Sequence, residues 1–131
     1  MNKKIYTAVF ILCILFAFNF ANAQQQTLTS TSQKQCQWNI STQKDENCVE
    51  MQKEYSISID KTEDRIRISH PVKTYIFKII STEEYANLSV YKVIKATGVG
   101  KIITYNSVDN WIKISDEQPT ESSITQYYFT K

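Results

Sequence analysis

Histidine, glycine, proline and cysteine are all scarce in this sequence, which has one histidine, two glycines, two prolines and three cysteines. Nucleophilic catalysis needs a base beside the nucleophile, and zinc needs three or four Cys, His or carboxylate ligands. His70 has Ser69 as its neighbour, but adjacent strand residues point to opposite faces. Gly98 and Gly100 precede an expected strand, whereas a phosphate-binding glycine motif precedes a helix. We therefore expect neither an enzyme nor a bound metal or cofactor.

The first 23 residues have the three parts of a secretory signal peptide. Lys3 and Lys4 form a charged start, residues 8–20 form an apolar run, and Ala21-Asn22-Ala23 fits a cleavage site. The run is shorter than the roughly 20 residues that a membrane-spanning helix needs. We expect cleavage before Gln24, export to the periplasm or the extracellular medium, and no transmembrane segment in the mature chain.

The chain that follows this segment has no net charge. Lys3 and Lys4 account for the whole net charge of +2, so the remainder is neutral. A surface that binds polyanions needs clustered Lys and Arg. The only two arginines, Arg65 and Arg67, directly follow two acidic residues. We expect no nucleic acid partner.

Residues 24–34 are mostly Gln, Thr and Ser, and Leu28 is their only large apolar residue. A segment of this composition buries too little apolar surface to become ordered on its own. We expect residues 24–34 to form a flexible polar leader or an edge strand. The rest, residues 35–131, has the length of one ordinary domain.

Alternation of apolar and polar residues dominates the sequence from Val49 onward. Apolar residues occupy most odd positions of residues 49–59, and polar residues occupy the even ones, which is typical of a half-buried strand. A polar turn over residues 60–64 and a second alternating run over residues 65–69 predict a hairpin. Further strands are expected at residues 74–80, 89–96, 101–108, 111–115 and 123–131.

The strand expected at residues 74–80 is apolar on most of both faces, which predicts a central position in its sheet. The segment after it begins with Ser81-Thr-Glu-Glu84, a capping-box pattern that favours a short helical turn near residues 82–88. The β-branched Val90 and Val93 favour a strand directly afterwards.

Short strands joined by close turns indicate antiparallel pairing, because parallel strands need long crossovers. The sequence therefore predicts an all-β, single-domain antiparallel meander of about seven or eight short strands, forming a small barrel or a sandwich. In architecture this resembles the lipocalin-like barrels. The Gly-x-Trp pattern of their first strand is not matched, since Cys36 stands where the glycine would precede Trp38. The resemblance therefore implies no ligand.

Cys36 and Cys48 are the two cysteines outside the signal segment, and in an exported chain they predict one disulfide. Their spacing is too wide for a CxxC redox pair. If Cys48 continues the alternation of the following strand, it lies on the face opposite the apolar residues at 55–59. Trp38 and Ile40 share the parity of Cys36, so we expect a disulfide-pinned hairpin that carries them on the side away from that core.

Tyrosine and tryptophan combine apolar area with a polar group, which suits binding surfaces as well as interiors. Consecutive aromatic residues at 127–129 must divide between the two faces of a strand. The residues expected to form a binding surface are Trp38, Ile40, Trp111, Tyr127 and Tyr128.

The function expected from these features is that of a non-catalytic, secreted or periplasmic β-scaffold that binds a small apolar molecule, a glycan or a protein. One alternative is a structural or assembly component of the cell envelope, joined to an envelope protein through an edge strand. Another is a secreted inhibitor that uses the disulfide-bounded loop.

Overall fold

The computed structural model describes residues 25–130, and these residues form nine β-strands without a helix. The expected signal segment and Lys131 lie outside the described residues. Between residues 25 and 130 there is no helix long and apolar enough to cross a membrane. The strands are β1 (Gln25–Asn39), β2 (Lys44–Met51), β3 (Tyr55–Asp60), β4 (Arg65–His70), β5 (Lys73–Glu84), β6 (Leu88–Lys95), β7 (Gly100–Asn106), β8 (Trp111–Asp116) and β9 (Ile124–Thr130).

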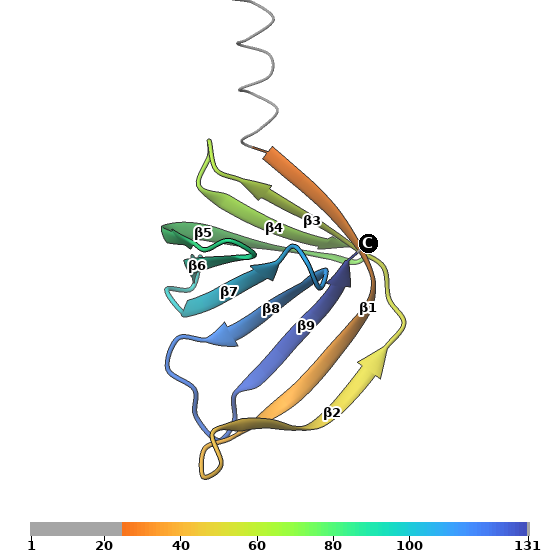
Figure 1. The fold of residues 1–131 in the computed structure, drawn as a ribbon, viewed down its shortest axis with the longest axis vertical. Helices are drawn as coiled ribbons and strands as arrows, with labels where there is room; N and C mark the ends of the chain where they lie inside the picture. The colour runs from red at the N-terminus through yellow and green to blue at the C-terminus, as the bar shows by residue number, and fades with distance from the viewer. Residues whose placement is uncertain (1–24, 131) are drawn as a thin grey trace, which may run out of the picture.

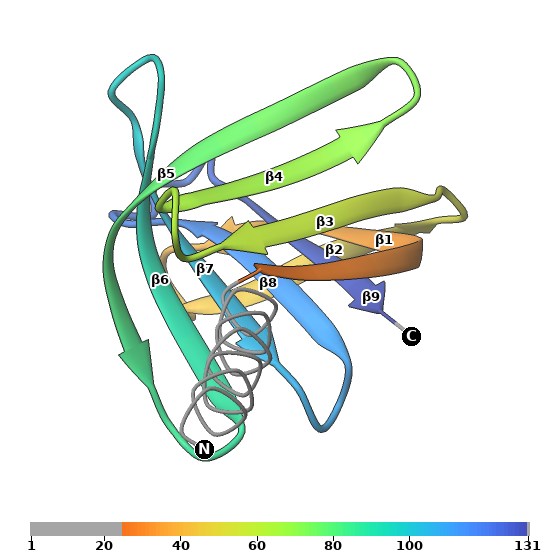
Figure 2. The same ribbon diagram turned by 90° about the horizontal axis from the view of Figure 1, so that it is seen from above.

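All pairings are antiparallel, and the first strand closes the sheet into a barrel. β3 to β9 pair in sequence order, and β1 pairs with β3 through Gln25–Ser30 and with β9 through Ser30–Gln37. The result is a closed eight-stranded barrel of β1 and β3–β9, whose strands surround a common interior (Figure 2). The structure therefore selects the barrel over the sandwich.

β2 is the ninth strand and lies outside the closed ring. It pairs with the C-terminal half of β1, on the same edge of β1 whose N-terminal half pairs with β3. In Figure 1, β1 curves from β3 at the top to β2 at the bottom, with β9 beside its lower half. The single strand expected over residues 49–59 is thus two strands, separated by residues 52–54, which are unpaired. Lys53, which breaks the alternation, lies in this gap.

Residues 25–34 belong to β1, although their composition predicted a flexible leader or an edge strand. Gln25–Ser30 pair with β3 and the residues from Ser30 onward pair with β9, so the segment is an ordered strand that links the two ends of the sheet. Its order comes from two neighbouring strands rather than from its own apolar content, and the sequence of the segment alone does not contain that information.

The expected helical turn near residues 82–88 is wrong. β5 continues to Glu84, and the amide of Tyr85 donates to the carbonyl of Leu88 at 2.8 Å in a tight connection to β6. Thr82 and Glu83 pair with Tyr91 and Val90 across this hairpin. The ladder hydrogen bonds to β6 replace those that a capping box would supply.

Apolar residues on both faces of residues 74–80 predicted a central strand. β5 does lie between β4 and β6, but only one of its faces is buried. Phe77 and Ile79 point into the barrel, whereas Ile76 and Ile80 remain 49% and 56% exposed. A strand in a closed barrel has one interior face, so no position in this fold covers both sides of β5.

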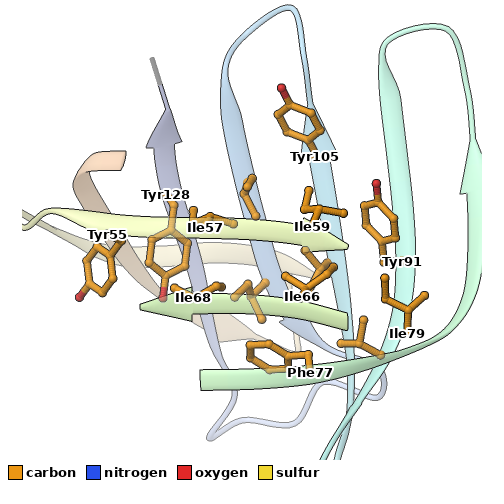
Figure 3. Close-up of a cluster of buried hydrophobic side chains, with 14 residues drawn as sticks. Tyr55, Ile57, Ile59, Ile66, Ile68, Phe77, Ile79, Tyr91, Tyr105 and Tyr128 are labelled. Carbon is orange, nitrogen blue, oxygen red and sulfur yellow. The ribbon is translucent and has the colours of Figure 1, made fainter. Parts of the chain in front are cut away.

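The barrel interior is filled by isoleucines in its middle, with buried tyrosines toward each end. Isoleucines of β3 and β4 lie in the middle, with Tyr55 and Tyr128 at one end and Tyr91 and Tyr105 at the other (Figure 3). The fully buried isoleucines are Ile57, Ile59, Ile66, Ile68, Ile103 and Ile112. Burying each of these side chains stabilises the fold by about 1.5–3 kcal/mol.

A buried polar network joins the three strands that meet where the barrel closes. The Gln33 amide on β1 donates to the Tyr128 hydroxyl at 3.1 Å, and its carbonyl accepts from the Tyr55 hydroxyl at 3.0 Å. The two tyrosine rings meet edge to face with centroids 4.9 Å apart. Gln33 is 2% exposed, so no solvent replaces these bonds if the side chain is changed.

We predict that Gln33→Met destabilises the protein by about 2–4 kcal/mol, because two buried tyrosine hydroxyls lose their partner. Gln37→Met is the matched control, since exposed Gln37 makes only a surface bond from Asn47 and should cost less than about 0.5 kcal/mol. Urea unfolding of both variants measures the difference. Equal effects would show that the network contributes nothing specific.

Candidate functional site

The structure divides the expected binding surface between the inside and the outside of the barrel. Tyr128 is 1% exposed and points inward with Gln33. Its neighbours Tyr127 and Phe129 point outward and are half-buried, as consecutive strand residues must alternate. Trp111 on β8 lies opposite Phe129 on β9 and also points to the outside of the barrel. The five residues therefore do not form one surface.

An outer cluster forms around Tyr127. Its ring lies 6.2 Å from that of Trp111, and the ammonium of Lys34 lies 4.6 Å above the Tyr127 ring. Its hydroxyl donates to the Asp45 carboxylate at 2.7 Å, and Lys113 lies 4.0 Å from the same oxygen. Burial, followed by the bond and charge of Asp45, raises the pKa of Tyr127 far above its usual value. These contacts tie β2 to β8 and β9 and leave the aromatic rings partly covered.

The predicted disulfide is present. Cys36 and Cys48 are bonded with their Cα atoms 4.1 Å apart, beside a bulge in the β1–β2 register. Trp38 follows Cys36 at the same parity on β1 and lies opposite Asp45. This places Trp38 on the outer side, away from the barrel core, as the spacing predicted. Ile40 is 48% exposed at the tip of the hairpin.

A cavity of about 360 Å³ opens at one end of the barrel. Its walls come from the C-terminal ends of β4, β6 and β8 and the N-terminal parts of β5, β7 and β9, which share one end in an antiparallel barrel. The lining residues are Gln35, Ile68, Tyr75, Phe77, Lys95, Lys101, Ile114, Asp116, Ser122, Ile124, Gln126 and Tyr128.

The lining combines apolar and charged groups. Ile68, Phe77 and Ile114 are core residues, each at most 3% exposed, and they lie beneath the cavity, whereas Tyr75 and the half-exposed Ile124 provide accessible apolar surface. Lys95 and Lys101 are less buried and line the same space. The cavity therefore offers apolar contacts on one part of its wall and ammonium groups on another.

Asp116 neutralises one of the two lysines. It forms an ion pair with Lys101 and accepts a hydrogen bond of 2.5 Å from the Ser123 hydroxyl. Burial opposes the charged carboxylate, but the bonds from Lys101 and Ser123 and the charge of Lys95 outweigh it and lower the pKa of Asp116. Among residues 25–130, Lys95 has no ion-pair partner within 4.0 Å. The cavity thus retains one uncompensated positive charge.

The cavity lysines and Asp116 were not identified from the sequence, although a signal for them exists. Lys95 has the parity of buried Tyr91 and Val93, and Asp116 has the parity of buried Ile112 and Ile114. A charged residue at the end of an otherwise apolar inward stripe indicates a polar barrel mouth. Recognising this requires knowing which stripe faces inward and that the strands form a closed barrel.

We predict that Asp116→Asn destabilises the protein by about 1 kcal/mol at neutral pH, because Lys101 loses its buried ionic partner. The folded-state pKa of Asp116 lies below its unfolded value of about 3.9. Its contribution is therefore complete above that value and disappears as the pH falls through the folded-state pKa. Denaturant unfolding between neutral pH and pH near 3 should show the two proteins converging at the acidic end.

Glu117→Gln is the matched control for Asp116→Asn, because Glu117 pairs with Lys92 at the surface. Its cost should be less than about 0.5 kcal/mol. A constant difference between Asp116→Asn and the wild type down to the lowest pH would contradict the assignment.

Searches with protein-family models, against curated proteins and against solved structures find no significant match to this chain. The cavity and the outer cluster are therefore interpreted from their own geometry.

Proposed function

We propose that this chain is a non-catalytic, exported binding module whose barrel cavity holds a small amphipathic molecule carrying a carboxylate or a similar anionic group. The observation that carries this proposal is Lys95, an unpaired ammonium group in a cavity that also has apolar lining residues. An ammonium and apolar side chains together complement a molecule that has both an anionic and an apolar end.

The size of the cavity supports a small ligand. Pockets for small molecules usually enclose about 300–1,000 Å³, and this cavity lies near the lower limit. The apolar part of the ligand would lie against Tyr75 and Ile124, above the core residues, while Lys95 would donate to the anionic group. Asp116 keeps Lys101 engaged, which limits the site to about one negative charge.

The disulfide supports an exported location, secreted or periplasmic. Disulfides form and persist in oxidising compartments and are rare in the cytosol. Cys36 and Cys48 are bonded across two strands at the margin of the barrel. This agrees with the signal peptide that residues 1–23 indicate.

A second candidate function is assembly with an envelope protein through β2. This strand stands at the end of the sheet order, and its outer edge is free of a partner strand in the described part of the chain. An open edge can accept a further strand. Half of the eight residues of β2 are charged, however, and charges on an edge strand discourage such pairing. For this reason we place ligand binding first.

We predict that decanoate raises the melting temperature of the protein, whereas decanol and decyltrimethylammonium do not. Lys95→Gln should weaken decanoate binding about tenfold or more, because a hydrogen bond to a charged group is lost. Lys53→Gln is the control, since exposed Lys53 lies between β2 and β3 and outside the cavity lining. Thermal shift and titration calorimetry measure both effects.

Equal stabilisation by decanol and decanoate would show that the Lys95 ammonium does not contribute to ligand binding. Stabilisation by none of the three compounds would count against a cavity for amphipathic anions.

A further inference from the structure

The outside of the barrel has an apolar strip that neither the cavity nor the outer cluster uses. Since Phe77, Ile79, Val93 and Ile103 point inward, their strand neighbours point outward. These outward residues are Ile76 and Ile80 on β5, Ile94 on β6 and Ile102 on β7, and we call them the isoleucine face. Ile76 and Ile80 are about half exposed, and Ile94 and Ile102 are half-buried.

Basic residues alternate with these isoleucines across neighbouring strands. Ile76 lies opposite Arg67, Ile94 lies opposite Lys78, and Ile102 lies opposite Lys92 in the strand register. All three basic side chains are exposed. Arg67, Lys78 and Lys92 therefore lie among these isoleucines, and their apolar stems can extend the apolar area of the isoleucine face.

Two of these cations have no ionic partner. Lys92 pairs with Glu117 at 2.6 Å, but neither Arg67 nor Lys78 has an acidic group within 4.0 Å among residues 25–130. Acidic residues lie further along the same strands, with Glu63 and Asp64 at the turn before β4 and Glu83 and Glu84 at the end of β5. The unpaired positive charge on this face is therefore that of Arg67 and Lys78.

We propose that the isoleucine face docks on the surface of a lipid bilayer that contains anionic lipids. Exposed isoleucines can enter the boundary between headgroups and acyl chains, while Arg67 and Lys78 reach the lipid phosphates. The outer surface of a barrel is convex, and apolar and basic groups alternate on it at short intervals. A fluid lipid surface can conform to such a face, whereas a protein partner would need a matching concave shape.

Docking on lipid is independent of the cavity, although the two features are neighbours. Lys95 directly follows Ile94, and Lys101 directly precedes Ile102. A protein held on a bilayer through the isoleucine face would therefore have its cavity opening close to the lipid surface.

Sedimentation with vesicles tests the docking surface. The protein should bind vesicles of equal parts phosphatidylglycerol and phosphatidylcholine, bind pure phosphatidylcholine much more weakly, and dissociate as salt is raised. Each basic residue near an anionic surface contributes about fivefold in affinity, so Arg67→Gln with Lys78→Gln should weaken binding about 25-fold. Lys44→Gln with Lys53→Gln removes the same charge on the β2 side and should leave binding unchanged.

A second pair of variants tests the contribution of the exposed isoleucines to vesicle binding. Ile76→Ser with Ile80→Ser should weaken vesicle binding, whereas Val49→Ser with Val108→Ser, at exposed positions on β2 and in the β7–β8 turn, should not. Lys95→Gln should weaken vesicle binding far less than it weakens decanoate binding, because Lys95 lines the cavity, and this difference separates the proposal from ligand binding.

Three outcomes would overturn the proposal: no binding to the anionic vesicles, equal binding to both kinds of vesicle, or equal losses in the variant and control pairs. Light scattering adds a fourth, because a dimer that Ile76→Ser with Ile80→Ser dissociates would identify a second copy of the chain as the occupant.

Discussion

The fold depends on the simultaneous pairing of β1 with β3 and with β9. Without it, the remaining strands would form an open sheet with two unpaired edges and an interior exposed along the seam. Gln25–Ser30 pairs with the free edge of β3, and Ser30–Gln37 pairs with the free edge of β9, so one strand closes the barrel. The Gln33 network and the disulfide both attach to this strand.

The polar composition of β1 is consistent with this role. Its inward positions contain Gln33 and Gln35 rather than isoleucines, because they face tyrosine hydroxyls and the cavity instead of the middle of the core. Ser30 is buried where the β1–β9 register shifts, and its hydroxyl donates to the carbonyl of Ser32 at 2.8 Å. Gln33 and Ser30, which would destabilise an apolar core, therefore find hydrogen-bond partners at the seam.

Alternation in the sequence predicted most of the barrel because each strand after residue 55 has one apolar face. The hairpin at residues 60–64 and the disulfide followed from turn composition and from the cysteine count. Three features were not predictable in this way. The order of residues 25–34 depends on pairing with strands that are distant in the sequence. Glu83 lies in a strand instead of a helical turn because it pairs with Val90 on β6. The charged residues of the cavity become neighbours only when the barrel closes.

Because closure by β1 brings Gln35 beside the cavity and completes the wall against which Tyr128 lies, the proposed binding site exists only in the closed barrel. Native-state hydrogen exchange tests closure most directly, since it measures the opening free energy of each amide. The closed barrel predicts that the paired amides of Gln25–Gln37 are protected to about the same degree as those of β3 and β9. Rapid exchange throughout Gln25–Lys34, with protection of β3 to β9 retained, would contradict it.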